Sequence, residues 1–441
     1  MLLPKNVRAC VDALENAGFA AYLVGGCVRD ACLGLQPQDF DLCTAALPEE
    51  TQAVFAAQKL VLAGKKHGTV GVVTDSGVVE ITTFRAEGDY ADNRHPGWVK
   101  FVPSVEEDLA RRDFTVNAMA YSPTRGVADP FGGRADLENR VLRAVGDPDT
   151  RFREDSLRIL RGVRFAVKYR LTVEPNTMDA MMRLAPLMDS LARERVFEEL
   201  CKLLPLVTAA DLIRFAPVIT RVIPELAPTV GFDQRSTHHA YDIYTHIAHV
   251  VEAVPAQPAL RWAALLHDVG KPACFTVGED GHGHFKGHAG AGTALADAVL
   301  QRLKAPTRLR EEVLFLIGQH MTKLEPDKRL LRRWLSRWGA QWLEALLALQ
   351  EADMSSKGTG KAEDMAQFDT LREMLARIIE EEGCLSIRDL AVDGHDLMAL
   401  GLEGAEIGRM LRYLLEQVLE ETLSNEKCAL LQAAKDRRKY V

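Results

Sequence analysis

The amino-acid sequence predicts a small α/β head with a mixed sheet, followed by an all-helical remainder. Segments typical of strands and helices alternate up to about residue 145, whereas helical periodicity predominates from about residue 154 onward. The chain has 441 residues, which suggests roughly two to four domains. Glycine and proline breaks mark the expected boundaries, near 146–148, 216–231, 255–258 and 356–360.

The head is expected to begin with a helix and to continue with strands. Residues 6–19 carry apolar side chains at helical spacing, and short apolar runs at 21–24 and 39–43 predict strands. Residues 70–74 and 78–84 predict a β-hairpin, because both are rich in β-branched residues and an Asp-Ser-Gly turn joins them.

Composition excludes several classes of protein. A hydrophobic content of 47% and a charged content of 26% are ordinary for a soluble globular chain. No apolar run has the length of a membrane span, and the N-terminus lacks a signal-peptide pattern. The eight cysteines include no CxxC pair, which favours reduced thiols in a cytoplasmic protein. The net charge of −8 means that any RNA-binding surface must be a local patch.

A glycine turn followed by two carboxylates is the strongest chemical signal. Gly25 and Gly26 lie in the segment Leu23-Val-Gly-Gly-Cys-Val-Arg-Asp30, and Asp39 and Asp41 follow nine and eleven residues after Asp30. On a strand, residues i and i+2 point to the same face, so both carboxylates are expected to meet one point in space. Carboxylates beside a phosphate-cradling turn suit Mg²⁺ and indicate nucleotidyl transfer.

Other polar segments of the head support this interpretation. Glu80 is expected on a strand, either as a third carboxylate near the metal or as an exposed glutamate. The segment 111–118 brings together Arg112, Asp113 and Asn117, and arginine clamps stabilise a transferring phosphoryl group. The segment 129–136 is a glycine turn with flanking acids, which on its own is weak support for a site.

A helix expected to open at Glu154 carries a polar stripe. Asp155 and Arg158 are three residues apart and therefore share one helix face, which Arg161 and Arg164 continue. A carboxylate beside a guanidinium offers acceptors and donors in one plane and can read the Watson–Crick edge of a base. The two further arginines could reach a triphosphate.

Four motifs in this order resemble those of bacterial class II CCA-adding tRNA nucleotidyltransferases, in the polymerase β superfamily. They are GGCVRD with DFD, RRDFTVNAMAY, DPFGGRADL and REDSLRILRGVRF, within residues 23–165. The resemblance implies a polymerase β-like head followed by a neck, a body and a tail, with tRNA, CTP and ATP as partners. The implied roles are two Mg²⁺ ions on Asp39 and Asp41, nucleotide contacts from Gly26, Arg29, Arg112, Arg161 and Arg164, and selection of C and then A by Asp155 and Arg158.

Related activities remain open at this point. One metal ion would activate the tRNA 3′-hydroxyl and the other would hold the triphosphate. A polar loop at 85–96 resembles the family loop needed for the switch to A, which argues against an enzyme that adds only CC. An A-adding enzyme, a poly(A) polymerase, and an RNA-binding protein without turnover stay as alternatives.

A second constellation lies in the helical half. His267 and Asp268 are adjacent at the end of an apolar helix that is expected to break at Gly270 and Pro272, where both side chains can meet one metal. The pattern resembles the HD domain of metal-dependent phosphohydrolases. The resemblance implies His246, His267, Asp268 and Asp353 as metal ligands, with His288 and His320 at positions that complete a second metal site or touch phosphate.

Histidine ligands suit Mn²⁺, Ni²⁺ or Fe²⁺, and a phosphohydrolase activity is the alternative function of a different class. A helical scaffold that binds no metal is the other interpretation of this region. With both resemblances, the expected domains are a catalytic head at 1–145, a neck and RNA-binding region at 146–232, an HD domain at 233–355 and a tRNA-binding tail at 356–441. The oligomeric state and the individual tRNA contacts stay undetermined.

Overall fold

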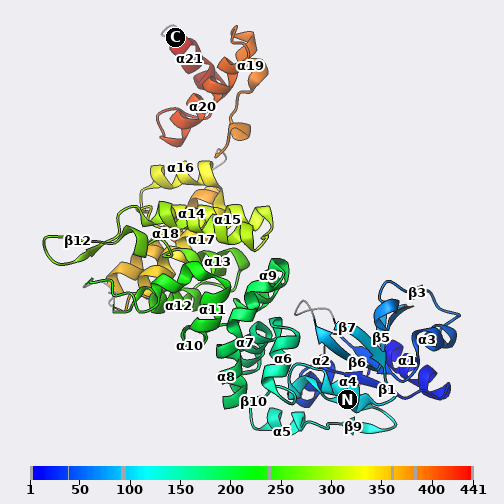
Figure 1. The fold of residues 1–441 in the computed structure, drawn as a ribbon. Helices are drawn as coiled ribbons and strands as arrows, with labels where there is room; N and C mark the ends of the chain where they lie inside the picture. The colour runs from blue at the N-terminus through cyan, green and yellow to red at the C-terminus, as the bar shows by residue number, and fades with distance from the viewer. Residues whose placement is uncertain are drawn as a thin grey trace. The chain divides into compact units, whose positions relative to one another are not determined.

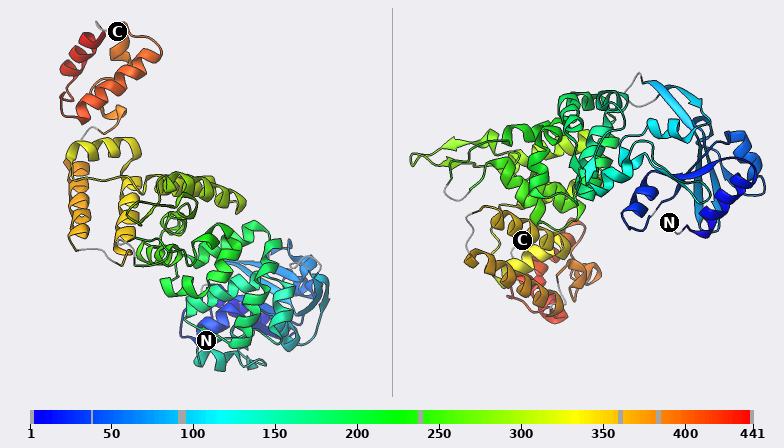
Figure 2. Two further views of the ribbon diagram at one scale, coloured as in Figure 1. Left: turned by 60° about the vertical axis from the view of Figure 1, so that its left-hand side comes forward. Right: turned by 90° about the horizontal axis from the view of Figure 1, so that it is seen from below.

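The computed structural model describes residues 3–37, 39–90, 96–236, 240–358, 362–381 and 385–438. The chain divides into two compact units (Figures 1 and 2). The first unit comprises Met1–Val207, Arg214–Ala227 and Arg302–Lys304. The second comprises Thr208–Ile213, Pro228–Gln301 and Ala305–Val441. The division into four domains stays a prediction, since these two units do not test its boundaries.

The first unit contains a seven-stranded mixed sheet with the strand order β3-β4-β5-β2-β1-β8-β9, in which only β2 and β5 run parallel. The strands are β1 (Ala21–Val24), β2 (Asp41–Thr44), β3 (Leu60–Val61), β4 (Thr69–Thr74), β5 (Gly77–Thr83), β8 (Ala120–Ser122) and β9 (Gly126–Ala128). The predicted mixed sheet is therefore confirmed.

Short helices surround this sheet. The helices are α1 (Lys5–Asn16), α2 (Gly26–Cys32), α3 (Pro48–Val54), α4 (Val105–Ala110) and α5 (Gly133–Glu138). The apolar side of α1 is buried, and α1 and α3 pack against the strands near β5. A second cluster of buried apolar residues joins β1 and β2 to α4. The glycine turn between β1 and α2 therefore follows an inner strand of the sheet, which is packed against α4.

Helices complete the first unit. They are α6 (Pro148–Glu154), α7 (Leu157–Tyr169), α8 (Pro175–Leu184), α9 (Arg193–Leu203) and α11 (Ala216–Val222), while α10 (Ala209–Arg214) lies at the boundary. Two short strands form a parallel pair: β10 (Val141–Leu142) precedes α6, and β11 (Thr172–Val173) follows α7. The buried side of α7 is almost wholly apolar, and α9 packs against it.

The second unit is helical apart from one small hairpin, β12 (Thr276–Val277) and β13 (Gly283–His284). Its helices are α12 (Ile243–Ala253), α13 (Pro258–Leu266), α14 (His288–Arg302), α15 (Thr307–Gln319), α16 (Lys328–Trp338), α17 (Ala340–Ser355), α18 (Ala362–Glu381), α19 (Gly394–Ala399), α20 (Ala405–Leu419) and α21 (Lys427–Arg438). The last three helices share an apolar core of their own.

Two predicted elements differ from the structure. The strand expected at 39–43 begins at Asp41, so Asp39 precedes β2. The polar loop expected at 85–96 is partly an antiparallel ribbon of β6 (Arg85–Tyr90) and β7 (Pro96–Phe101), while residues 91–95 lie outside the described part of the chain. The polar composition of 85–96 hid the ribbon, because a two-stranded ribbon needs no buried apolar face to pair its backbone groups.

The glycine turn at 129–136 has a structural explanation. Asp129 accepts hydrogen bonds from the backbone nitrogens of Gly133 and Arg134 at 2.7 and 2.9 Å, so it caps α5. The backbone of Gly133 lies so close to the carbonyl of Thr115 that an added Cβ would stand 2.1 Å from that oxygen. This motif therefore positions the segment 111–118 rather than forming part of the cavity itself.

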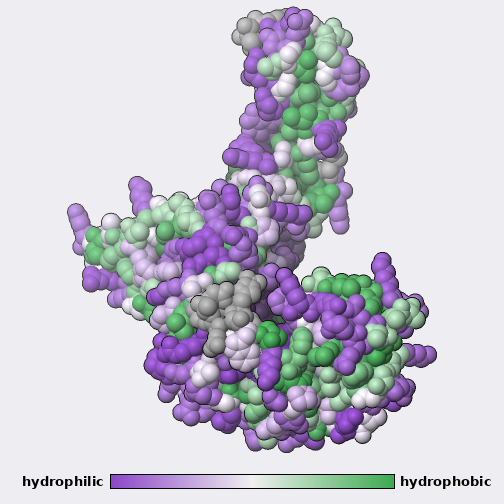
Figure 3. All heavy atoms as spheres, turned by 45° about the vertical axis from the view of Figure 1, so that its right-hand side comes forward, coloured by the Kyte–Doolittle hydropathy of each residue, from purple (hydrophilic) through white to green (hydrophobic). Residues whose placement is uncertain are grey.

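The described residues contain no helix with the length and apolar content that a membrane span requires. On the face shown in Figure 3, hydrophilic residues alternate with smaller apolar patches.

We expect Gly133→Ala to lower the melting temperature of the protein by several degrees. The new methyl group would meet backbone atoms that cannot rotate away, and overpacking of this kind costs about 1–3 kcal/mol. Differential scanning calorimetry measures the change. Gly408→Ala is the matched control, because no atom lies within 4 Å of an added Cβ in α20. Equal melting temperatures for both variants would contradict the expectation.

Candidate nucleotide site and candidate metal centre

A cavity of about 460 Å³ in the first unit gathers most of the predicted nucleotide-binding residues. Its walls contain six arginines against three aspartates, so the cavity is cationic although the whole chain is acidic. The lining residues are Gly25, Gly26, Arg29, Asp41, Arg111, Arg112, Asp113, Asn117, Asp155, Leu157, Arg158, Arg161, Phe165 and Arg195. This excess of guanidinium groups suits a polyanionic ligand such as a triphosphate.

The glycine turn brings backbone and guanidinium together at one end of the cavity. Gly25 has a φ of 70°, which L side chains rarely adopt, and its amide donates to the carbonyl of Met119 at 3.2 Å. An added Cβ on Gly25 would lie 2.8 Å from Nη1 of Arg112. Glycine at this position therefore lets the guanidinium of Arg112 lie directly on the turn.

Asp41 lies at the start of β2 and faces the cavity. It pairs with Val24 of β1, next to the glycine turn. Burial raises the pKa of Asp41, Arg112 opposes this rise and the charge of Asp39 adds to it. Two carboxylates that repel each other, one of them partly desolvated, form a donor set that a hard divalent cation stabilises.

Asp39 and Glu80 are not among the residues that line the cavity. Asp39 precedes the strand, so the alternation of side chains along a strand does not fix the direction of its carboxylate. Glu80 lies in β5, which runs parallel to β2 with Leu42 opposite Ile81. The preceding residues of the two strands, Asp41 and Glu80, are therefore neighbours in this register. The roles predicted for Asp39 and Glu80 therefore stay predictions.

Asp113 connects two sides of the cavity. Its carboxylate accepts hydrogen bonds from Arg161 at 2.8 and 2.9 Å and from the amide of Asn117 at 3.0 Å. Burial alone would raise the pKa of Asp113, but the positive charge of Arg161 and these hydrogen bonds lower it to about 2. Asp113 is therefore ionised at neutral pH, and it orients Arg161 at the cavity wall.

The predicted helix face of Asp155 and Arg158 is corrected by the structure. Asp155 lies in extended backbone between α6 and α7, because α6 ends at Glu154 and α7 begins at Leu157. Arg158 donates to Glu154 at 2.6 Å instead of pairing with Asp155. Both side chains still line the cavity, so a break between two helices, rather than one helix face, brings them there.

Residues of α9 contact Asp155 and the polar side chains of α7. The sequence predicts that the segment 192–200, which resembles the family's neck helix, packs against the nucleotide site, but it assigns no role to Arg195 or Glu199 individually. Arg195 makes two hydrogen bonds to Asp155, the shorter at 2.7 Å. Glu199, four residues further along, accepts from Arg164 at 2.5 Å. Arg164 is not among the residues that line the cavity, and its predicted contact with nucleotide stays a prediction. The spacing of four residues between Arg195 and Glu199 was the available signal, because it puts both on one helix face.

Asp108 is a further residue that sequence reasoning missed. It is fully buried and accepts hydrogen bonds from Arg111 at 2.9 Å and from Arg112 at 3.3 Å. The backbone nitrogen of Arg85, at the start of the β6–β7 ribbon, donates to the same carboxylate at 3.3 Å. One buried acid therefore holds both cavity arginines of this segment.

In the second unit, the residues predicted as HD ligands form a buried cluster. Nε2 of His246 lies 2.9 Å from Asp353 and 3.6 Å from Asp268, and Nε2 of His267 lies 3.3 Å from Asp268. His246, His267 and Asp268 present ligand atoms within 4.8 Å of one another. As predicted, α13 ends at Leu266, so the adjacent His267 and Asp268 can both point into the cluster.

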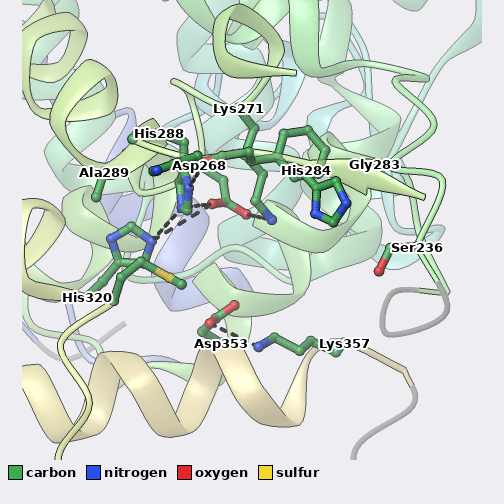
Figure 4. Close-up of a pocket in the computed structure, with 14 residues that line it drawn as sticks. Ser236, Asp268, Lys271, Gly283, His284, His288, Ala289, His320, Asp353 and Lys357 are labelled. Carbon is green, nitrogen blue, oxygen red and sulfur yellow. Dashed lines mark hydrogen bonds and ion pairs between the residues drawn. The ribbon is translucent and has the colours of Figure 1, made fainter. Parts of the chain in front are cut away.

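His288 and His320 extend the cluster on the other side of Asp268. Their Nε2 atoms lie 3.1 Å apart, and they lie 3.5 and 4.0 Å from Oδ1 of Asp268. These three residues form a second group of potential ligands, which shares Asp268 with the first. Figure 4 shows both histidines pointing toward Asp268 from one side, with Nζ of Lys271 on the other, 2.7 Å from Oδ2.

All four histidines use Nδ1 in the same way. Each Nδ1 lies within hydrogen-bonding distance of a backbone carbonyl, at 3.3, 2.8, 2.8 and 2.7 Å for His246, His267, His288 and His320. A neutral histidine that donates through Nδ1 presents a lone pair on Nε2, the atom that faces the cluster. Burial lowers the pKa of His320 to about 4 and also lowers that of His288, so both are neutral at pH 7.

The cluster opens into a cavity of about 610 Å³ with three lysines on its walls. Asp268, His288, His320 and Asp353 lie on this wall, together with Lys271, Lys286 and Lys357. Nε2 of His267 and Oδ2 of Asp268 are buried and lie 3.3 Å apart, and Nζ of Lys271 forms an ion pair with the same oxygen. This donor set fits divalent metal ions, and the lysines suit an anionic group beside them.

Three basic side chains of the helical region form ion pairs with acids. Arg302 pairs with Glu225, Lys304 with Glu194, and Arg310 with Asp297. These side chains therefore offer less free charge to an RNA than the sequence indicates.

Family models match three parts of the chain. Residues 21–143 match the Poly A polymerase head domain, and residues 170–214 match the RNA and SrmB-binding site of polymerase A. Residues 289–434 match tRNA nucleotidyltransferase domain 2. Together with the cationic cavity, these matches define a template-independent nucleotidyltransferase.

Relatives that match this chain over nearly its whole length identify the family within this class of enzymes. The CCA-adding enzyme of Streptococcus thermophilus is 34% identical over 97% of this chain and 96% of its own length. That of Streptococcus mutans is 32% identical over 97% of both chains. The structure of Bacillus stearothermophilus CCA-adding enzyme in complex with CTP covers 100% of this chain and 99% of its own, with 27% identity and a TM-score of 0.70. The chain belongs to the family of CCA-adding enzymes, and this membership implies a reaction that depends on divalent metal.

We expect Asp113→Asn to destabilise the protein by roughly 2 kcal/mol at pH 7, from a pKa of about 2 in the folded state and an ordinary pKa of 3.8. A lowered folded pKa stabilises the protein fully above pH 3.8, and this stabilisation is lost as pH falls through 2. The difference between variant and wild type should therefore shrink to roughly half at pH 3. Urea unfolding at pH 7 and pH 3 measures it, and a difference that does not change with pH would contradict the pairing with Arg161.

Proposed function

We propose that this chain adds CCA to the 3′ end of tRNA, using CTP and ATP and releasing pyrophosphate. The observation that carries the proposal is the cationic cavity, where Asp41 and the glycine turn meet the arginines of residues 111–112 and of α7. The family and its full-length relatives support the same activity.

The cavity residues divide into groups for phosphate and for base. Gly25, Gly26 and Arg112 lie at the glycine turn, where backbone N–H groups and a guanidinium can bind the triphosphate. Asp113 and Asn117 hold Arg161 in place, so the charge of Arg161 meets the ligand without reorganisation. The protein thus supplies positioning and electrostatic stabilisation.

Asp155 and Arg158 are the proposed base-reading pair. Cytosine and adenine both carry an amino group next to a ring nitrogen acceptor, so a carboxylate and a guanidinium complement both. Uracil and guanine present a carbonyl and an N–H at these positions and would leave the protein groups unpaired. Arg195 holds the Asp155 carboxylate at the cavity wall by two hydrogen bonds.

Mg²⁺ is the proposed metal at Asp39 and Asp41, because both offer only carboxylate oxygens. When bound, the metal would supply activation of the attacking hydroxyl and stabilisation of the departing pyrophosphate. Asp41 supports this proposal by its place in the cavity, next to the turn that would bind the triphosphate.

The decisive experiment gives the purified protein a tRNA that lacks CCA, with CTP alone, ATP alone and both. Product lengths distinguish complete CCA addition from addition of A only and from open-ended polyadenylation. We expect three added nucleotides with both substrates. Extension beyond three nucleotides would favour the poly(A) polymerase alternative.

Asp41→Ala should reduce this incorporation by at least about 10³-fold, because the metal would lose one of its two proposed carboxylate ligands. The melting temperature should stay near that of the wild type, since Asp41 is exposed at the start of its strand. Asp75→Ala is the matched control, an exposed aspartate in the hairpin turn between β4 and β5. Incorporation that survives Asp41→Ala would contradict the proposed metal site.

The buried histidine cluster supports a second candidate function, a metal-dependent phosphohydrolase in the second unit. The observations that favour it are the four Nε2 atoms that face the cluster, the Asp268 carboxylate shared by both groups of ligands, and the lysine-lined cavity. Mn²⁺, Ni²⁺ or Fe²⁺ are the proposed metals, because imidazole ligands favour transition metals.

Metal analysis after purification without chelators tests this second function. We expect one or two transition-metal ions per chain, and a loss of all bound metal in Asp268→Ala, because both groups of ligands use this carboxylate. His395→Ala is the control, since His395 is exposed in α19. A wild-type protein that contains no metal, takes up none on reconstitution and hydrolyses no phosphoester would leave the cluster with a structural role only.

A further inference from the structure

Tyr169 is the last residue of α7 and lies behind the nucleotide cavity. Only 6% of Tyr169 is exposed, and it does not line the cavity. Its hydroxyl nevertheless reaches the residues that follow the glycine turn. The oxygen accepts a hydrogen bond from Nη2 of Arg29 at 2.5 Å and donates one to Oδ1 of Asp30 at 3.1 Å.

Arg29 is held on every side by these and other partners. Nε and Nη2 donate to Asp30 at 2.9 and 2.8 Å, and Nη1 donates to Asn117 at 2.5 Å. The guanidinium carbon lies 4.3 Å from the ring centroid of Tyr169. Because these hydrogen bonds hold its guanidinium group, Arg29 contributes a positive charge at a fixed position in the cavity wall.

The same partners connect Tyr169 to the opposite end of α7. Arg29 bonds Asn117, Asn117 bonds Asp113, and Asp113 bonds Arg161. The rings of Phe165 and Tyr169 stack with their centroids 6.2 Å apart, so the Tyr169 ring is also fixed. A continuous network therefore runs from the end of α7 through the glycine turn and back to the cavity face of α7.

We propose that Tyr169 is a positioning residue for nucleoside triphosphate binding, because its hydroxyl holds Arg29 and Asp30 in place after the glycine turn. This inference rests on the proposed function, which assigns the cavity to a triphosphate. The hydroxyl acts on the turn and not on Asp155 or Arg158. Its loss therefore weakens the binding of CTP and ATP by the same factor and leaves the choice of base unchanged.

Tyr169→Phe tests the proposal, because it removes one oxygen atom and keeps the buried ring. Isothermal titration calorimetry with CTP and with ATP, on the full chain in the presence of Mg²⁺, gives the dissociation constants. A hydrogen bond to a charged group corresponds to a factor of about ten, so we expect about tenfold weaker binding of both nucleotides. Tyr121→Phe, the same chemical change on half-buried β8, is the control.

A double-mutant cycle with Arg29→Gln separates positioning from a general loss of stability. If the hydroxyl acts through Arg29, Tyr169→Phe weakens nucleotide binding in the wild-type background and adds no further loss in the Arg29→Gln background. All titrations are made well below the melting temperatures of the variants. A full loss that persists without Arg29, or different factors for CTP and ATP, would overturn the inference.

The outcomes also distinguish this inference from the proposed function. A wild-type protein that binds both nucleotides and fails to extend tRNA contradicts the proposed function, while the binding cycle still tests Tyr169. Unchanged affinity in Tyr169→Phe overturns the inference and leaves the CCA-adding activity intact. A wild-type protein that binds neither nucleotide overturns both.

Discussion

The nucleotide cavity depends on one buried acid, Asp113. Its carboxylate takes hydrogen bonds from Asn117 and Arg161, and Asn117 in turn accepts from Arg29. A buried carboxylate is unfavourable alone, and the positive charge of Arg161 is what keeps its pKa near 2. The segment 111–118, the glycine turn and α7 are therefore held in one arrangement by charges that satisfy one another. Protein partners hold these groups in place, which is the condition for electrostatic preorganisation.

Helix α9 extends the same principle to the outer side of α7. Arg195 supplies a cation to Asp155, and Glu199 supplies an anion to Arg164. The polar stripe of α7 is thus divided: Arg161 faces the ligand cavity, whereas Arg164 is held by the neighbouring helix. The division explains why repeated arginines on one helix need not share one function, since each takes the partner that packing brings to it.

The two candidate sites differ in their chemistry. The cavity of the head combines carboxylate oxygens with guanidinium groups, which suits Mg²⁺ and phosphates. The cluster of the second unit combines imidazole nitrogens with Asp268 and Asp353, and every imidazole is oriented by a backbone carbonyl. Such second partners fix the ring and the tautomer, so the four Nε2 atoms converge without help from the ligand. Lysine side chains beside this cluster add the charge that a phosphate would need.

Several features of both units could be predicted from sequence because their signals are local. The glycine turn, the hairpin of β4 and β5, and the break after α13 at His267 each follow from a few adjacent residues. The start of β2 at Asp41 was not predicted, because backbone pairing with β1 sets the limit of that strand. The β6–β7 ribbon was not predicted, because its polar residues lack the apolar alternation of a half-buried strand. The prediction that Asp155 and Arg158 share one helix face is wrong, because the chain breaks between α6 and α7 at that position.

The sequence by itself determined the order of motifs, the residue types of both candidate sites and the family to which the chain belongs. Only the tertiary structure decided which partners those residues take. Tyr169 bonds Arg29 across 140 residues of chain, and Arg195 bonds Asp155 across 40. Hydrogen bonds between such side chains form only after helices and sheet have packed, because packing alone excludes water and brings the groups within 3 Å of one another.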